Sequence, residues 1–172
     1  MKVPSQALNR PLNWATQQTK SHELENQMSR RLGFYIGNLG LLIAKAATSE
    51  LTYPLPLCPI PNTAAWLLGL INLRGNLVPV FDLHKLLQLK PKEDTIPMLL
   101  ILGSGELAGA MLIDSLPVHL NFFEEEDKLS SLPPLPNMIK SYTSTGYEKN
   151  GEFWFNFDHL GFFEYLATQV AV

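Results

Sequence analysis

Residues 71–83 constrain the fold more than any other part of this 172-residue chain. They read as two apolar strands joined by a tight turn at Gly75-Asn76, because glycine adopts positive φ freely and asparagine tolerates it better than most residues. Arg74, the only arginine after Arg31, stands beside this turn. An unpaired guanidinium is costly to bury, so Arg74 must find an acceptor or reach solvent. The segment therefore predicts a β-hairpin that carries either a recognition group or a structural ion pair.

A second segment repeats this pattern. Gly75 lies seven residues before Asp82, and Gly151 lies seven residues before Asp158. Each interval is an apolar strand that ends in Phe-Asp, and each aspartate precedes a short apolar segment, 84–89 or 159–167. An aspartate at such a position caps a helix and meets the positive end of its dipole. Asn150-Gly151 is the strongest type I′ turn signal in the chain. Two copies of strand, strand and helix predict two similar lobes.

Further strands are predicted from apolar runs between turn residues. A hairpin with a Gly37-Asn38 turn is expected over 32–44, a second around the loop 103–106, and another strand over 117–122. Residues 54–61 contain four prolines. Proline cannot donate to a ladder, so this segment is a crossing loop or a sheet edge. Asn62 is expected to cap a short helical turn over 63–68 that Gly69 ends.

Residues 1–31 differ in composition from the rest of the chain. They are rich in Gln, Asn, Ser, Lys and Arg and contain few large apolar side chains. One interpretation is a flexible extension. The other is a short helix that begins at Ser21, with Leu24, Met28 and Leu32 on one face. We expect a flexible extension over 1–31 and one domain of two intertwined lobes over 32–172.

Composition and motifs argue against several functional classes. The net charge of −3 provides no electrostatic footprint for nucleic acid. No apolar run is long enough to span a bilayer, and no apolar stretch follows Lys2, so we expect a cytoplasmic protein without membrane insertion. The single cysteine, Cys58, excludes an internal disulfide. The histidines are scattered at 22, 84, 119 and 159 without ligand spacing. We therefore expect no catalytic residues, no metal site and no cofactor.

The residues around Arg74 resemble the signature of the CheW-like domain, the adaptor of bacterial chemosensory arrays. The family pattern is roughly G-x-x-N-L-R-G-x-x-x-P-V-x-D-L, and the residues that fit it are Gly69, Asn72, Leu73, Arg74, Gly75, Pro79, Val80, Asp82 and Leu83. Weaker similarity extends over about 32–168. The resemblance implies a mainly β fold in which two SH3-like five-stranded β-barrel lobes pack together, with short helices.

The same resemblance implies a non-enzymatic adaptor in chemotaxis signal transduction, associated with membrane chemoreceptor arrays. One surface would contact the regulatory domain of a CheA-type histidine kinase, and the groove between the lobes would contact the helical hairpin tip of a chemoreceptor. Glu50 matches the family's glutamate and is expected to hold Arg74 by bidentate hydrogen bonds. The alternative is an exposed ion pair worth less than about 1 kcal/mol. By matched position the partner-binding residues are Glu50, Gly69, Asn72, Leu73, Arg74 and Gly75.

Two alternative functions from other functional classes remain open. One is a small β-barrel protein that binds a ligand or nucleic acid, although the chain is acidic and lacks interleaved basic and aromatic residues. The other is an enzyme whose site is assembled from distant residues, although no recognisable constellation is present. The sequence does not separate flagellar chemotaxis from pilus-based or phototactic motility.

Overall fold

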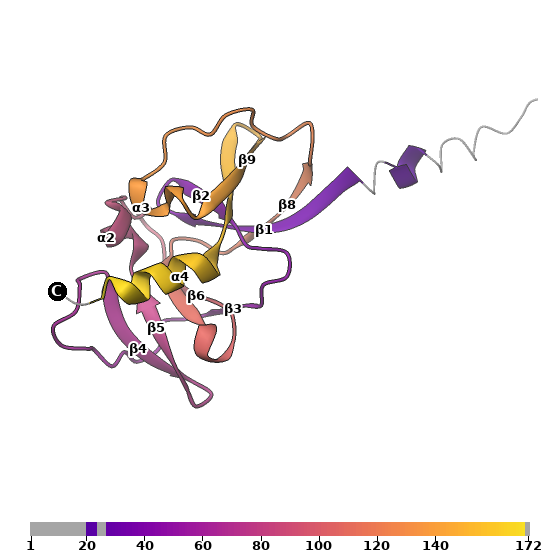
Figure 1. Ribbon diagram of the computed structural model, residues 1–172. Helices are drawn as coiled ribbons and strands as arrows, with labels where there is room; N and C mark the ends of the chain where they lie inside the picture. Colours follow the sequence, from indigo (N-terminus) through magenta and orange to yellow (C-terminus); the bar gives the residue numbers. More distant parts are fainter. Residues whose placement is uncertain (1–19, 24–26, 171–172) are drawn as a thin grey trace, which may run out of the picture.

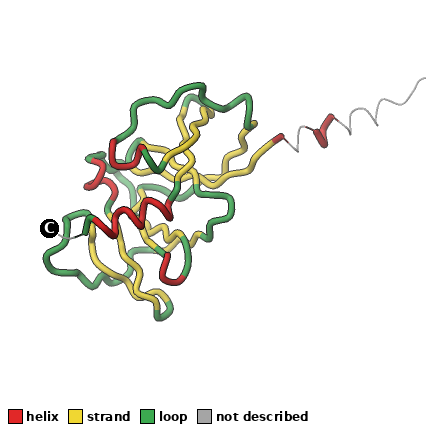
Figure 2. The backbone as a smooth tube through the Cα atoms, viewed as in Figure 1, coloured by secondary structure: helices red, strands yellow, loops and turns green. Residues whose placement is uncertain are grey.

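The computed structural model describes residues 20–23 and 27–170, and these form two five-stranded sheets (Figures 1 and 2). Lobe A has the strand order β8-β1-β2-β10-β9, and lobe B has the order β3-β6-β7-β5-β4. The chain starts in lobe A, builds all of lobe B, and returns to complete lobe A. The predicted mainly β fold of two five-stranded lobes is confirmed.

The elements have the following bounds. Lobe A contains β1 (Met28–Ile36), β2 (Leu39–Leu42), β8 (Val118–Phe123), β9 (Thr143–Lys149) and β10 (Glu152–Phe157). Lobe B contains β3 (Ser49–Thr52), β4 (Leu67–Leu73), β5 (Asn76–Phe81), β6 (Met98–Leu102), the 3₁₀ turn η1 (Gly105–Leu107) and β7 (Gly109–Ile113). The helices are α2 (Leu83–Leu87), α3 (Asn137–Lys140) and α4 (His159–Thr168). No helix in the described part of the chain is long and apolar enough to cross a membrane.

The internal repeat of the sequence is a repeat of structure. In lobe B the hairpin β4-β5 leads into α2, and β5 pairs in parallel with β7. In lobe A the hairpin β9-β10 leads into α4, and β10 pairs in parallel with β2. Asp82 accepts a hydrogen bond from the Lys85 amide at 3.2 Å, and Asp158 accepts one from the Gly161 amide at 3.1 Å. Both predicted helix caps are therefore confirmed, and α2 and α4 begin directly after them.

Each sheet curls so that the segment after its first edge strand meets the opposite edge. In lobe B the proline-rich segment after β3 bridges β4 through Cys58 and Leu70, whose amides and carbonyls exchange hydrogen bonds of 2.8 and 2.9 Å. In lobe A, Lys128 lies opposite Tyr147 of β9 in an antiparallel bridge. The hydrogen bonds of this bridge run from the Leu129 amide to the Gly146 carbonyl and from the Glu148 amide to the Asp127 carbonyl, each 2.8 Å long. The proline-rich segment is thus an edge that helps to close a barrel, one of the two alternatives that the sequence left open.

The helical turn expected over 63–68 is wrong. Strand β4 begins at Leu67 and runs through Gly69, with a register irregularity between these two residues. Gly69 has a φ of 141°, and a Cβ placed there would lie 2.5 Å from the Cys58 carbonyl oxygen. Glycine at this position serves the close approach of the proline-rich segment to β4, and it does not end a helix.

Strand β1 also begins earlier than the sequence indicated. Residues 28–31 pair with β8 although they were assigned to the extension. Met28 and Leu32 both lie in this strand, so the helix with Leu24, Met28 and Leu32 on one face is wrong, although residues 20–23 including Ser21 are helical. Residues 1–19 and 24–26 lie outside the described residues, and the flexible extension stays a prediction.

The core has three parts. The largest lies between the lobes, where buried side chains of both sheets pack against α4, which Figure 1 shows crossing between the two groups of strands. A smaller cluster around Ile71 and Ile101 fills lobe B, and another around Phe122 and Trp154 fills lobe A. Alternation along β6 illustrates the division, because Leu99 and Ile101 enter the lobe B cluster and Leu100 and Leu102 enter the shared one. The lobes therefore share the largest of the three hydrophobic clusters.

Candidate functional site

The β4-β5 hairpin places Arg74 in the turn itself. Leu73 pairs with Asn76, so the two turn residues are Arg74 and Gly75, with φ of 52° and 88°. The expected turn pair Gly75-Asn76 is wrong by one residue, because a two-residue type I′ turn needs positive φ at both positions and Asn76 already belongs to β5. The Asn72 side-chain oxygen accepts a hydrogen bond from the Gly75 amide at 2.8 Å and fixes the turn.

The Arg74 guanidinium joins the two edges of the lobe B sheet. Arg74 Nη2 donates to Glu50 Oε1 at 2.7 Å. Glu50 belongs to β3 and Arg74 follows β4, which are the two end strands of the sheet. The predicted ion pair is thus present, with one hydrogen bond in place of the bidentate pair expected. It spans the seam of the barrel, the line along which the end strands β3 and β4 face each other. The Arg74 side chain is 73% exposed and that of Glu50 is 36% exposed.

A hollow of about 250 Å³ lies beside this ion pair. Its wall includes Glu50, Leu73 and Arg74, together with the β6-β7 loop around Ser104. Two large apolar side chains in neighbouring elements of lobe B are unusually exposed: Leu77 of β5 is 66% exposed and Leu107 of η1 is 59% exposed. Exposed leucines and an exposed charged pair on one lobe are features of a protein-binding surface.

The six predicted site residues fall into two groups. Glu50, Leu73 and Arg74 meet at the hollow. The other three support this surface: Asn72 and Gly75 form the turn, and Gly69 is buried beneath the Cys58 segment. The structure therefore brings the charged residues together and assigns Gly69 a structural role.

A buried polar cluster joins the two lobes and was not predicted. Asp114, which follows β7, accepts hydrogen bonds from the Gly37 amide at 2.6 Å and, in the tautomer with a proton there, from His84 Nε2 at 2.9 Å. His84 Nδ1 lies 3.5 Å from Asp82 Oδ1. Hydrogen bonding to Asp82 raises the pKa of His84, against the effect of burial, and Asp114 adds to the increase. The position of Asp82 two residues before His84 was visible in the sequence, but Asp114 and Gly37 are distant along the chain.

The described residues contain no group of three or more His, Cys, Asp or Glu side chains arranged to hold a metal ion. The Asp82–His84–Asp114 cluster is an internal hydrogen-bonding network on this geometry, since its atoms are already paired with each other and with the Gly37 amide.

Comparison with known proteins bears on the family. The profile of the CheW-like domain matches residues 31–164, which span both lobes. The chain belongs to the CheW-like family. A chemotaxis protein CheW of Rhizobium meliloti (strain 1021) is 30% identical over 121 residues, which are 69% of this chain and 74% of the relative. A chemotaxis protein CheW of Thermotoga maritima is 26% identical over 112 residues, 65% of this chain and 66% of the relative.

A solved structure supports the same fold. The scaffolding protein TtCheW from Thermoanaerobacter tengcongensis superimposes with a TM-score of 0.63 at 13% identity, covering 90% of each chain. As a CheW-like protein, this chain is a member of a family of chemotaxis scaffold and adaptor proteins.

Proposed function

We propose that this CheW-like chain is a non-enzymatic adaptor that couples chemoreceptors to a CheA-type histidine kinase. The observation that carries the proposal is the exposed Arg74–Glu50 pair at the seam of lobe B, inside the segment that matches the family signature. The proposed partners are the regulatory domain of the kinase and the helical hairpin tip of the receptor. The protein would accordingly act in the cytoplasm, at membrane receptor arrays.

Stability alone does not account for an arginine at this turn. An exposed ion pair contributes less than about 1 kcal/mol, and a non-glycine residue in the left-handed region costs roughly 1 kcal/mol or more. The equivalent position in lobe A holds Asn150, a residue type that tolerates a positive φ, here 53°. Arginine, in contrast, is enriched among the residues that dominate binding energies at interfaces. The near balance of cost and gain in the free protein supports a role for Arg74 in partner contact.

The surroundings of the pair support the same role. Glu50 holds the guanidinium in one orientation, so less side-chain entropy is lost when a partner binds. The exposed side chains of Leu77 and Leu107 supply apolar area for the contact. Asn72, Gly75 and Gly69 keep the hairpin in shape without touching the partner. Arginine together with exposed apolar area is typical of an interface hot spot.

Co-sedimentation of the full chain with receptor-containing membranes and kinase tests the proposal. Arg74→Gly is the most informative variant, because glycine suits the φ of 52° and the fold should be retained or slightly stabilised. We expect Arg74→Gly to weaken ternary assembly about thirtyfold, in line with hot-spot truncations of roughly 2 kcal/mol. Glu50→Ala should have a smaller effect, and the double variant should be less than additive.

Arg30→Ala provides the matched control, because Arg30 is an exposed arginine on β1 of the other lobe. Its assembly should equal that of the unmodified chain. Unchanged assembly by a folded Arg74→Gly variant would refute the proposed contact. A loss of assembly of equal size with Arg30→Ala would show that the loss seen with Arg74→Gly comes from the general surface charge and not from a specific contact.

A further inference from the structure

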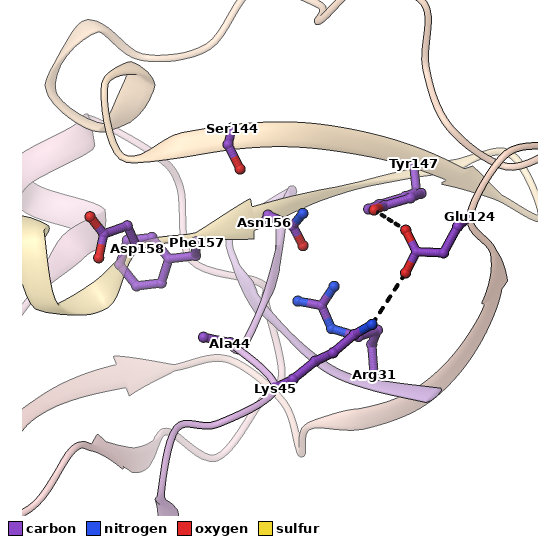
Figure 3. Close-up of a pocket in the computed structure, with 9 residues that line it drawn as sticks. All are labelled: Arg31, Ala44, Lys45, Glu124, Ser144, Tyr147, Asn156, Phe157 and Asp158. Carbon is purple, nitrogen blue, oxygen red and sulfur yellow. Dashed lines mark hydrogen bonds and ion pairs between the residues drawn. The ribbon is translucent and has the colours of Figure 1, made fainter. Parts of the chain in front are cut away.

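Strand β9 is held by side-chain and backbone contacts up to the residue before its turn. Beside the lobe A pocket shown in Figure 3, the Tyr147 hydroxyl donates to Glu124 Oε2 at 2.6 Å. The Glu148 amide donates to the Asp127 carbonyl at 2.8 Å, and Lys149 Nζ lies 3.2 Å from Asp127 Oδ2. The body of the β9-β10 hairpin is therefore fixed, and conformational freedom is confined to its tip.

The tip itself, Asn150-Gly151, is free of such contacts. Lys149 pairs with Glu152, so Asn150 and Gly151 are the two turn residues, with φ of 53° and 79°. Both are exposed, and a Cβ placed on Gly151 would meet nothing within 4 Å. In the described part of the chain, neither the Asn150 side chain nor the Gly151 amide has a hydrogen-bond partner. The peptide bond between the two residues is thus open to water at the end of a fixed hairpin.

The corresponding turn of lobe B is built differently. Arg74-Gly75 has the same place in the β4-β5 hairpin as Asn150-Gly151 has in β9-β10, and Asn72 has the place of Glu148. Asn72 Oδ1 accepts a hydrogen bond from the Gly75 amide at 2.8 Å. The exposed Glu148 side chain makes no such bond to the Gly151 amide. Lobe A therefore combines an asparagine at the first turn position with an unheld glycine amide, and lobe B has neither.

We propose that Asn150 is a site of spontaneous deamidation. The Gly151 amide nitrogen attacks Asn150 Cγ and loses its proton to water, and ammonia leaves as a five-membered succinimide ring closes. Water then opens the ring at either carbonyl and gives aspartate or isoaspartate. Glycine favours the attack because no Cβ crowds its nitrogen, and the attack needs only a brief opening of an exposed turn, which costs little free energy. Asn150 is the only asparagine in the sequence that is followed by glycine.

The two products affect the hairpin differently. Aspartate keeps the backbone and suits the first position of a type I′ turn, as asparagine does. It adds a negative charge between Glu148 and Glu152 in the chain, which are both exposed. Isoaspartate carries the main chain through its Cβ and adds one atom to a two-residue turn, so it disturbs the pairing of Lys149 with Glu152. Either product makes the tip of lobe A more acidic, and the reaction does not depend on the proposed adaptor function.

A time course of the folded full chain in mildly alkaline buffer, followed by peptide mapping with mass spectrometry, tests the proposal. Mapping assigns aspartate and isoaspartate to individual positions. We expect conversion at Asn150 while other described asparagines, such as Asn76 and Asn121, stay unmodified. Conversion at Asn150 that is no faster than at Asn76 and Asn121, or that begins only once urea unfolds the chain, would overturn the proposal.

Three variants test the role of the free glycine amide. Glu148→Asn places in lobe A the side chain that holds Gly75 in lobe B, and it should slow the reaction at Asn150 about fivefold, the effect of one neutral hydrogen bond. Glu148→Ala is the matched control, which removes the same carboxylate without supplying that acceptor and should leave the rate unchanged. Arg74→Asn creates a second Asn-Gly turn in the same molecule, and position 74 should react about fivefold more slowly than Asn150, because Asn72 holds the Gly75 amide.

Equal rates at positions 74 and 150, or equal rates of Glu148→Asn and Glu148→Ala, would refute the role of the free amide. The time course of the unmodified chain decides on the site itself, whether or not these variants fold.

Discussion

The buried carboxylate of Asp114 offers the sharpest test of how the two lobes are held together. Asp114 follows β7 of lobe B, and its Oδ2 atom accepts from the Gly37 amide in the β1-β2 turn of lobe A and is hydrogen-bonded to His84 Nε2. The side chain is 5% exposed, so water does not replace a lost partner. We predict that Asp114→Asn, which keeps the shape and removes the charge, destabilises the fold.

The magnitude follows from the two hydrogen bonds. A hydrogen bond to a charged group contributes about 1.5–3 kcal/mol, and a neutral one about 0.5–1.5 kcal/mol. Replacing two charge-assisted bonds by at most two neutral ones therefore lowers the free energy of unfolding by about 2 kcal/mol. For a domain of this size the melting temperature should fall by about 4–8 °C.

The pH dependence has a definite sign. The pKa of His84 is raised in the folded state, by Asp82 first and by Asp114 as well. The stability that protonated His84 contributes is fully present below the unfolded pKa of about 6.5 and is lost as pH rises through the folded pKa. His159 has the opposite sign, because burial lowers its pKa and its contribution is lost as pH falls below about 6.5. The difference between the unmodified chain and a variant therefore isolates His84.

Chemical denaturation at a series of pH values from about 5.5 to 9 provides the assay. His84→Gln should be more destabilising at the acid end of this range than at the alkaline end, and Asp114→Asn should reduce the same pH-dependent part. His159→Gln is the control and should change the pH slope in the opposite direction. A His84→Gln deficit that stays constant with pH would refute the reasoning, as would an Asp114→Asn variant as stable as the unmodified chain.

Two stability predictions concern single residues. Gly69→Ala should lower the free energy of unfolding by about 2 kcal/mol or more, because its Cβ would lie 2.5 Å from the Cys58 carbonyl oxygen and its φ of 141° is strained for alanine. Urea denaturation measures this loss. Gly105→Ala is the control, because its φ is also positive but its Cβ would meet nothing within 4 Å, so it shows the cost of φ strain without the contact. Asp158→Ala should cost about 1 kcal/mol through the lost cap of α4, and a melting temperature equal to that of the unmodified chain would contradict the capping role.

Local signals in the sequence predicted the elements that local chemistry determines. The Asn150-Gly151 turn and the caps at Asp82 and Asp158 are formed as expected, because turn and cap preferences act within a few residues. The Arg74 turn was displaced by one residue for an identifiable reason. Asn76 looked like a turn residue by type, but the side chain that holds the turn is Asn72, which accepts from the Gly75 amide.

The features that could not be predicted from the sequence depend on contacts between residues that are distant along the chain. Gly69 resembled a helix stop until the Cys58 segment was placed against it. The Arg74–Glu50 pair was anticipated through the family resemblance, but its place across the barrel seam depends on how the sheet curls. The Asp114 link to Gly37 joins residues 77 positions apart, and no local pattern indicates it.

The repeat explains where the two lobes differ and why that difference matters. Both hairpin turns have two residues at positive φ and glycine in the second position. Lobe A has Asn150 in the first position, which suits the backbone, and lobe B has Arg74, which does not. Since the stability of lobe B does not explain Arg74, we propose that this residue is where lobe B departs from the shared fold toward recognition.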